Sequence, residues 1–222
     1  AQGGISDFTD LDFVQTDLTK EEGWSQAMTG VDSVIHVASP TPLQRPDADD
    51  LMVKMAVDGV KFVMKAAKEA GVERVVLTSA SGAVLAGHKD HPEIFTERDW
   101  TNLDAPINAY QRSKTMAEME LWKLAEAYGI EGASVSPTAV MGPTLGNDFS
   151  HSRAAIKNMF EGKMPRLLNL AFDYVDVRDV ADLHLLALEK KEAIGQRFIA
   201  TSGQNITYKK QAEFLKKEFG TK

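Results

Sequence analysis

The chain has 222 residues, of which 43% are hydrophobic and 26% charged, and its formal net charge is −7. These values are ordinary for a globular protein and are enough for one domain with a substantial core. Charges of both signs are mixed without a basic patch, so we expect no nucleic-acid partner. No apolar run could cross a bilayer, so we expect no membrane partner. The chain contains no cysteine, which excludes disulfides, thiol catalysis and cysteine-ligated metals and is compatible with the cytoplasmic location that we expect.

The first third of the chain alternates between strand and helix patterns. The expected order is a strand over 12–18, a short helix over 20–28, a strand over 32–38, a helix over 51–70 and a strand over 73–79. Alternation of this kind predicts a parallel sheet that is covered by helices on both faces.

A helix is expected to follow the long irregular stretch over 83–105, with Asn108 as its N-cap and its end at Gly129. After it come a strand over 132–137 and helices over 150–162, 180–189 and 207–219. The segments 83–105 and 144–170 have the least regular patterns. We expect both to face the substrate, because long loops at the carboxyl ends of parallel strands commonly form binding sites.

Tyr110 and Lys114 stand four residues apart in the helix that follows Asn108, which places both side chains on one face, one turn apart. An ammonium beside a phenol favours the phenolate and so lowers the phenol's pKa. Such a phenol can donate a proton to a carbonyl oxygen while hydride reaches the carbon. A tyrosine and a lysine also fall four apart by chance on solvated helices, so the pair gains meaning only from its context.

That context is a set of strand ends in a fixed order. It comprises His36-Val37-Ala38-Ser39-Pro40, Thr78-Ser79-Ala80-Ser81-Gly82, Pro137-Thr138-Ala139-Val140 and Tyr174-Val175-Asp176-Val177-Arg178-Asp179-Val180. Together with Tyr-x-x-x-Lys, this set resembles the extended short-chain dehydrogenase/reductase family, within the NAD-dependent epimerase/dehydratase superfamily. Inside that family the chain is most similar to the dihydroflavonol reductase and aldehyde reductase branch, from about Phe13 to Phe219.

The resemblance implies an α/β fold, a Rossmann-like doubly wound parallel sheet with a smaller substrate-facing part. Residues 1–143 are expected to form the cofactor-binding α/β part. Residues 144–222 are expected to form the substrate-facing part, with 171–190 packing back on the α/β part.

The resemblance also implies the activity, an NAD(P)H-dependent reduction of a small-molecule ketone or aldehyde. Tyr110 would be the general acid, and Lys114 would lower its pKa and hydrogen-bond the nicotinamide ribose. NADPH is expected rather than NADH, because the reductases of the family lean to NADPH. Two alternatives stay open. One is a nucleotide-sugar epimerase or dehydratase, which uses the same tyrosine and lysine, and the other is a truncated, non-catalytic remnant or cofactor sensor.

The family also places a serine or threonine at the end of the strand over 73–79, where it contacts the substrate carbonyl. A gapless match to the dihydroflavonol reductases puts this position at Ala80, and a shift of one residue puts it at Ser81. If the strand continues, Ser79 and Ser81 share one orientation and Ala80 points the other way. We favour Ser81 slightly over Ser79, and both remain candidates.

The match to the family also assigns cofactor contacts beyond Lys114. These are Asp17 and Leu18 for the adenine, Val37, Ala38 and Ser39 beside the ribose, Pro137, Thr138 and Val140 beside the nicotinamide, and Ser152 on the phosphates. In the same stretch that carries Tyr174, Asp179 is expected to cap the next helix and Asp176 to lie at the preceding turn. His88 and His91 have no third ligand at a suitable spacing, so we read them as loop residues and expect no metal site.

One family feature does not occur in the sequence. The family opens with a strand and a Gly-x-x-Gly-x-x-Gly turn whose amides hold the cofactor pyrophosphate. Gly3 and Gly4 follow no strand and have the wrong spacing. We therefore expect a β-α-β unit, roughly 30 residues or more, to be missing, so that either the sequence is incomplete or a partner must cover the exposed apolar surface.

Overall fold

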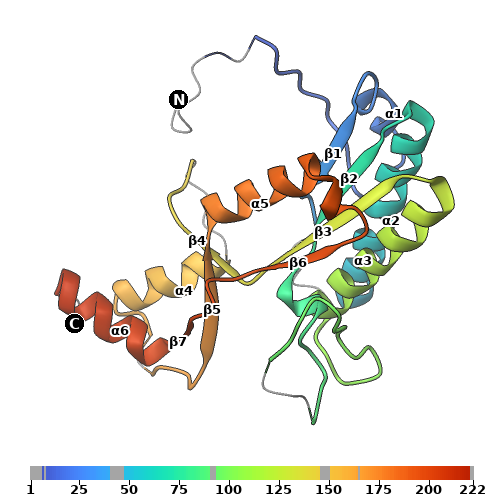
Figure 1. Ribbon diagram of the computed structural model, residues 1–222. Coiled ribbons are helices and arrows are strands. Elements are labelled where there is room, and N and C mark those ends of the chain that lie inside the picture. The colour runs from blue at the N-terminus through green and yellow to red at the C-terminus, as the bar shows by residue number, and fades with distance from the viewer. Residues whose placement is uncertain are drawn as a thin grey trace. The chain divides into compact units, whose positions relative to one another are not determined.

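A computed structural model describes residues 7, 9–40, 48–90, 94–145, 151–164 and 166–220 of the chain, without the side chains of residues 48 and 151–153. The chain divides into two compact units, which Figure 1 traces in ribbon form. The larger unit holds residues 11–137 and 182–199. The smaller unit holds the described residues within 138–181 and 200–222, together with residues 7, 9 and 10.

The larger unit is built on a four-stranded sheet with the order β1-β2-β3-β6. The strands are β1 (Ser33–His36), β2 (Arg74–Thr78), β3 (Glu131–Pro137) and β6 (Arg197–Ala200). β1, β2 and β3 run parallel, with Ser33 opposite Arg74 and Arg74 opposite Glu131. The connections are helical, through α2 (Ala48–Ala70) and α3 (Ala109–Tyr128), as parallel neighbours require.

Helices cover both faces of this sheet, and the alternation of side chains along β2 separates the two faces. Val75 and Leu77 point into the main core cluster, which is formed with α2, α3 and the short helix α1 (Trp24–Ala27). Arg74 and Thr78 point the other way, toward the second half of α5 (Val177–Glu189). The expected doubly wound parallel sheet is therefore confirmed.

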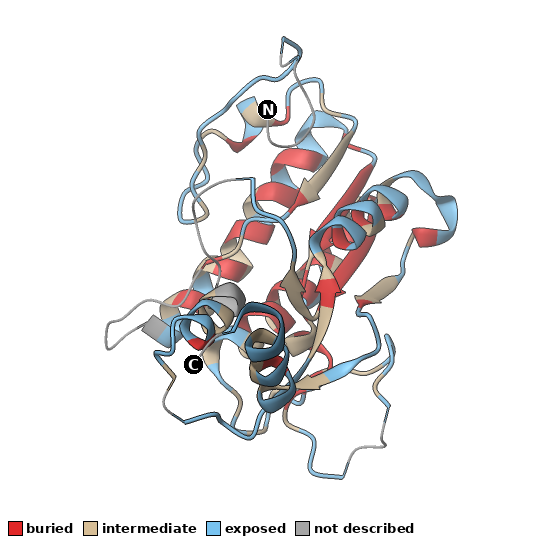
Figure 2. Ribbon diagram, turned by 90° about the vertical axis from the view of Figure 1, so that its left-hand side faces the viewer, coloured by how far each residue is buried: buried red, intermediate tan, exposed pale blue. Residues whose placement is uncertain are grey.

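The core of the larger unit lies between α2, α3 and the sheet, and Figure 2 colours buried residues red on the central strands and on the neighbouring helices. Met64 of α2 and Leu121 of α3 are fully buried, and Val75 of β2 is 1% exposed. Burying an apolar side chain of this size stabilises the fold by roughly 1.5–3 kcal/mol. The packing of α2 on α3 therefore fixes the axis of α3.

α3 begins and ends at the expected residues. The Asn108 side chain accepts a hydrogen bond from the Gln111 amide (2.9 Å), and the Gln111 side chain accepts one from the Asn108 amide (3.1 Å). This reciprocal arrangement is a capping box, which satisfies two backbone donors at the start of a helix. At the other end, Gly129 has φ 67°, a left-handed conformation that glycine adopts without a Cβ penalty.

The smaller unit contains its own sheet, with the order β4-β5-β7. β4 (Ala139–Met141) pairs parallel with β5 (Ala171–Asp176), and β5 pairs antiparallel with β7 (Asn205–Thr207). Two helices belong to this unit, α4 (His151–Phe160) and α6 (Tyr208–Phe219). The larger unit also contains two one-turn 3-10 helices, Ser81–Ala83 and Lys191–Ala193, which complete the elements of the described residues.

Three local expectations are wrong. Residues 12–18 form no strand, and Phe13 is 89% exposed, because a strand requires a ladder partner and this segment pairs with none. The helix expected over 20–28 is reduced to Trp24–Ala27. Asp176, and not Asp179, precedes α5 and accepts a hydrogen bond from the Arg178 amide (2.8 Å), so Asp179 lies inside the first turn.

Candidate active site

Tyr110 and Lys114 lie one turn apart near the start of α3, as their spacing predicts. Lys114 is 6% exposed, whereas Tyr110 is 40% exposed. The Lys114 Nζ donates a hydrogen bond to the backbone oxygen of Thr78 (3.0 Å), the last residue of β2. The first turn of α3 is therefore attached to the carboxyl end of a parallel strand, which is where sites form in sheets of this kind.

The protonation of this pair differs in part from expectation. Burial lowers the pKa of Lys114 to about 8, although the Glu118 carboxylate acts to raise that pKa. Burial also raises the pKa of Tyr110, so the expected lowering of the Tyr110 pKa is wrong for this arrangement. The reason is that the ammonium bonds to Thr78, and desolvation of the phenolate dominates. At neutral pH the phenol keeps its proton and can donate it.

A recess lies at the carboxyl ends of β1 and β2, beside Lys114. Its polar lining comes from His36, Ser39, Thr78, Ser79 and Lys114, with Ala38 and four apolar residues completing it. The recess thus contains two of the residues expected beside the cofactor ribose, Ala38 and Ser39. Val37, the third of that group, is 60% exposed.

His36 is a packed residue of β1 rather than a proton carrier. It is 6% exposed, and its ring meets the edge of Trp24 with centroids 6.5 Å apart. Burial and the nearby Lys114 charge lower the pKa of His36 to about 4, so the ring is neutral at physiological pH. A neutral imidazole beside Lys114 adds no second positive charge to the recess.

The two candidate serines occupy different environments. β2 ends at Thr78, so the strand alternation that would relate Ser79 to Ser81 does not apply. Ser79 is buried and donates its hydroxyl hydrogen to Glu118 Oε2 (2.6 Å). Ser81 opens the 3-10 turn and is half-buried.

The 3-10 turn that begins at Ser81 packs against the first turn of α3. A Cβ added at Gly82 would lie 3.3 Å from Cγ of Gln111, the residue after Tyr110. Glycine at position 82 therefore permits the close approach of the two backbones. The turn that contains Ser81 therefore packs against the helical turn that contains Tyr110, and the Ser81 hydroxyl is not among the donors to Glu118.

The remaining residues that were predicted to contact the cofactor lie in several different elements. Asp17 Oδ1 accepts from both the amide (2.8 Å) and the hydroxyl (2.7 Å) of Thr19, in a local turn. Leu18 packs on α2 against Gly59 and joins the core. Neither lines the recess beside Lys114.

Pro137, Thr138 and Val140 belong to two units. Pro137 ends β3 in the larger unit, whereas Thr138 and Val140 belong to the smaller one. Thr138 donates through its amide (3.0 Å) and its hydroxyl (3.2 Å) to the Ala200 oxygen, and Val140 pairs with Val175. Ser152 lies in α4, and its side chain is outside the described residues.

Of the two histidines in the 83–105 stretch, the structure describes His88. The His88 ring is hydrogen-bonded to the Trp100 backbone oxygen (2.9 Å) and lies 5.4 Å from the Phe95 ring. His91 lies outside the described residues. In the part of the chain that the structure describes, no three His, Asp or Glu side chains come together as metal ligands.

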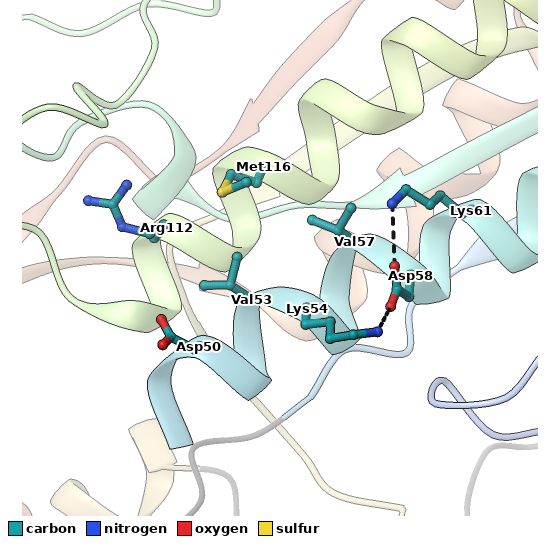
Figure 3. Close-up of a pocket in the computed structure, with 8 residues that line it drawn as sticks. All are labelled: Asp50, Val53, Lys54, Val57, Asp58, Lys61, Arg112 and Met116. Carbon is teal, nitrogen blue, oxygen red and sulfur yellow. Dashed lines mark hydrogen bonds and ion pairs between the residues drawn. The ribbon is translucent and has the colours of Figure 1, made fainter. Parts of the chain in front are cut away.

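A second hollow lies between α2 and α3 (Figure 3). Its charged side chains pair locally, with Asp58 accepting from Lys54 and from Lys61 (3.3 Å) on the same helix. Arg112, on α3, donates to the Leu103 backbone oxygen (2.9 Å). None of the predicted site residues lines this hollow, so we assign no chemistry to it.

One site residue was missed by the sequence reasoning. Glu118 lies four residues after Lys114 on α3 and is fully buried, and it accepts hydrogen bonds from Ser79, Ser134 and Arg197. The i, i+4 spacing from Lys114 is the one signal that could have indicated it. Arg197 is 79 residues away in sequence, and no local pattern indicates such a partner.

Residues 4–200 match the model of the NAD dependent epimerase/dehydratase family. The chain is 36% identical to cinnamoyl-CoA reductase 1 of Arabidopsis thaliana, over 86% of this chain and 56% of that protein. It is 32% identical to anthocyanidin reductase of Vitis vinifera, over 97% of this chain and 68% of that protein.

Among solved structures, the yeast methylglyoxal/isovaleraldehyde reductase complexed with NADPH superposes with a TM-score of 0.75 and 30% identity. The match covers 83% of this chain and 61% of the yeast chain. This chain thus spans somewhat more than half the length of several relatives that it matches. The extent of the family match, together with the reductase relatives, confirms the resemblance found in the sequence: the chain belongs to the NAD dependent epimerase/dehydratase family.

Proposed function

We propose that this protein is an NAD(P)H-dependent reductase of a small aldehyde or ketone. The observation that carries the proposal is the Tyr110–Lys114 pair, held at the carboxyl end of β2 by the bond from Lys114 Nζ to the Thr78 oxygen. The reductase names of the relatives support this reading over the epimerase alternative.

The recess itself, with a volume of about 10 Å³, holds no more than a water molecule, so it is the chemistry of the residues around it that suits the nicotinamide-ribose end of the cofactor. Lys114 offers a buried ammonium whose hydrogens can reach hydroxyl acceptors, and the small side chains of Ala38 and Ser39 let a ribose approach the backbone. The chemistry that the reduced nicotinamide supplies when bound is a hydride for the carbonyl carbon. NADPH is our proposal over NADH, because the yeast relative was solved with NADPH.

The chain's own contribution is the proton. As negative charge grows on the carbonyl oxygen, the Tyr110 hydroxyl donates its hydrogen to that oxygen, and the raised pKa of Tyr110 ensures that the hydrogen is present at neutral pH. The Lys114 ammonium nearby stabilises the phenolate that forms. Ser81 is our candidate for the second hydrogen bond to the carbonyl oxygen, because the Ser79 hydroxyl already serves Glu118.

We also propose that the two parts of the chain have different roles. Residues 1–143 would bind the cofactor and residues 144–222 would face the substrate. The cytoplasmic location stays a prediction from the cysteine-free composition. In the described residues, no helix has both the length and the apolarity needed to span a membrane.

The test compares Tyr110→Phe with Tyr128→Phe, the same change at the far end of the same helix. We expect carbonyl-dependent oxidation of NADPH, measured across a panel of simple aldehydes and ketones, to fall by about 10²–10⁴-fold in Tyr110→Phe and to stay near wild type in Tyr128→Phe. Near-normal turnover in Tyr110→Phe would refute the proposal. Saturable NADPH binding without turnover by the wild-type protein on any carbonyl compound would favour the cofactor-sensor alternative.

A second pair of variants separates the serines. Ser81→Ala is expected to lower kcat while leaving the free energy of unfolding nearly unchanged. Ser79→Ala is expected to lower that free energy, because it leaves part of the buried Glu118 carboxylate without a donor. The reverse pattern would move the catalytic assignment to Ser79.

A further inference from the structure

The carboxylate of Glu118 is a buried charge that accepts four hydrogen bonds from side chains. It is fully buried on the inner face of α3. Its Oε1 accepts from the Ser134 hydroxyl (2.6 Å) and from Arg197 Nε (2.7 Å). Its Oε2 accepts from the Ser79 hydroxyl (2.6 Å) and from Arg197 Nη2 (3.3 Å). An ionised carboxylate, which only accepts, is the form that this set of four donors satisfies.

Arg197 extends the network to the loop that precedes α3. Its Nη1 donates to the backbone oxygens of Glu97 (2.8 Å) and Asp99 (2.6 Å). Its guanidinium carbon lies 3.7 Å from the centroid of the Trp100 ring, a cation–π geometry. A buried ion pair needs extra hydrogen bonds of this kind to offset its desolvation. Glu118 thus connects α3 to Ser79, directly after β2, and to β3 and β6, and through Arg197 to the segment 94–105.

This network meets the catalytic pair at two points. Ser79, which holds Glu118, directly follows Thr78, whose backbone oxygen accepts from Lys114. Glu118 also lies one helical turn beyond Lys114, on the same face of α3. Both ends of the Lys114–Thr78 hydrogen bond are therefore fixed by a single carboxylate.

We propose that Glu118 is a positioning residue for the Tyr110–Lys114 pair, holding the inner face of α3 against the end of β2 and supplying the negative charge that keeps the Lys114 ammonium protonated. The catalytic part of this inference rests on the proposed reductase function. The structural and electrostatic part does not.

Glu118 is the carboxylate among the groups that face Lys114. The neighbours of Lys114 on α3 are Tyr110 and Glu118, and the neighbour on β1 is the neutral His36. On β2 the backbone oxygen of Thr78 accepts from Lys114, while the Thr78 hydroxyl is hydrogen-bonded to His184. Of these, the Glu118 carboxylate is the one that acts to raise the pKa of Lys114 against its burial.

The test is Glu118→Gln, which keeps the shape of the side chain and removes the charge, beside Glu126→Gln, an exposed control on the same helix. Lysine side chains labelled with ¹³C are titrated by NMR, and the Lys114 signal is identified by its absence in Lys114→Met. We expect the Lys114 midpoint to fall by about one pH unit in Glu118→Gln and to stay in place in Glu126→Gln. An unchanged midpoint in folded Glu118→Gln would overturn the proposal, whether or not the protein reduces carbonyls.

Turnover provides the second readout. If the midpoint of Lys114 falls by one unit, kcat at pH 8 should fall by about fivefold, the ratio of the two protonated fractions, and should recover toward lower pH. A loss of kcat that is the same at all pH values would mean a structural role alone and would also overturn the proposal.

Removing Glu118 alone leaves Arg197 buried without its partner, which can prevent folding. The double variant Glu118→Gln/Arg197→Met removes both charges together, a change that proteins tolerate better. The Lys114 midpoint is expected to fall in the double variant as well, but by less than in Glu118→Gln, because the opposing Arg197 charge is removed together with the carboxylate. An unchanged midpoint there would equally refute the role of Glu118.

Discussion

Replacing Lys114 by methionine should make the protein more stable at neutral pH, and the gain should shrink as the pH rises. Lys114 is 6% exposed, and burial brings its pKa from the ordinary 10.5 down to about 8. At about 1.4 kcal/mol per unit, that difference corresponds to about 3 kcal/mol of lost stability wherever both the folded and unfolded states carry the charge. Methionine has a similar length and no charge to desolvate.

The sign of the pH dependence follows from proton binding. Between pH 8 and 10.5 the unfolded chain still binds the Lys114 proton, whereas the folded chain has released it, so stability rises with pH in this window. The penalty is fully present below about pH 8. Integrated from about pH 7 to about pH 9.5, the recovery amounts to about 2 kcal/mol in the wild-type protein, and Lys114→Met should lack this recovery.

The assay is urea-induced unfolding at the two pH values for wild type, Lys114→Met and Lys123→Met. Lys123 lies on the same helix with a side chain that is 70% exposed, so its replacement should leave the pH dependence unchanged. The lost bond to the Thr78 oxygen reduces the gain from Lys114→Met by about 1 kcal/mol at both pH values. A stability difference between wild type and Lys114→Met that is equal at both pH values would refute the reasoning.

Two further predictions concern the scaffold. Leu121 is fully buried in α3, so Leu121→Ala should lower the free energy of unfolding by about 2–5 kcal/mol. Met119 on the same helix is 39% exposed, so Met119→Ala should change that free energy little. Equal effects of the two variants in urea unfolding would contradict the placement of the core. Gly87→Ala should lower the free energy of unfolding more than Gly129→Ala does, although both glycines have positive φ. An added Cβ at Gly87 would lie 2.8 Å from the Asn102 backbone oxygen, whereas at Gly129 it would meet nothing within 4 Å. Similar losses in the two variants would mean that residues 83–90 and 94–105 are not packed as described.

Features fixed by local signals were predictable from the sequence. α3 carries its own start signal in Asn108 and Gln111 and its own stop in Gly129, and the structure has both. The β-branched runs of the parallel strands were recognised for a similar reason, since a strand that is buried on both faces is apolar throughout. The shared helix face of Tyr110 and Lys114 followed from their spacing, whereas their expected role came from the resemblance to the family.

Features that depend on distant partners were not predictable. Residues 12–18 have a strand-like pattern, but a strand forms only where a neighbour completes its ladder. The exact end of β2 decides whether Ser79 and Ser81 share a face, and strand ends are uncertain by a residue or two at the level of sequence. The expected fall in the Tyr110 pKa assumed that the Lys114 ammonium acts on the phenol. Its hydrogen-bond partner is instead the Thr78 backbone oxygen, and no sequence motif reveals a backbone partner.

The arrangement at the end of β2 is better explained by chemistry than by stability. A buried lysine costs the fold about 3 kcal/mol on the reasoning above, and a buried glutamate–arginine pair is at best a weak source of stability. Apolar residues at 114, 118 and 197 would pack the same space at lower cost. The chain instead keeps a cation that is close to its titration point beside a phenol, with a carboxylate one turn away. Carrying this cost at one strand end is the pattern expected of a site that gives up stability for the proposed activity. The NMR titration of Lys114 measures its charge, and the urea unfolding of Lys114→Met measures the stability that the charge costs.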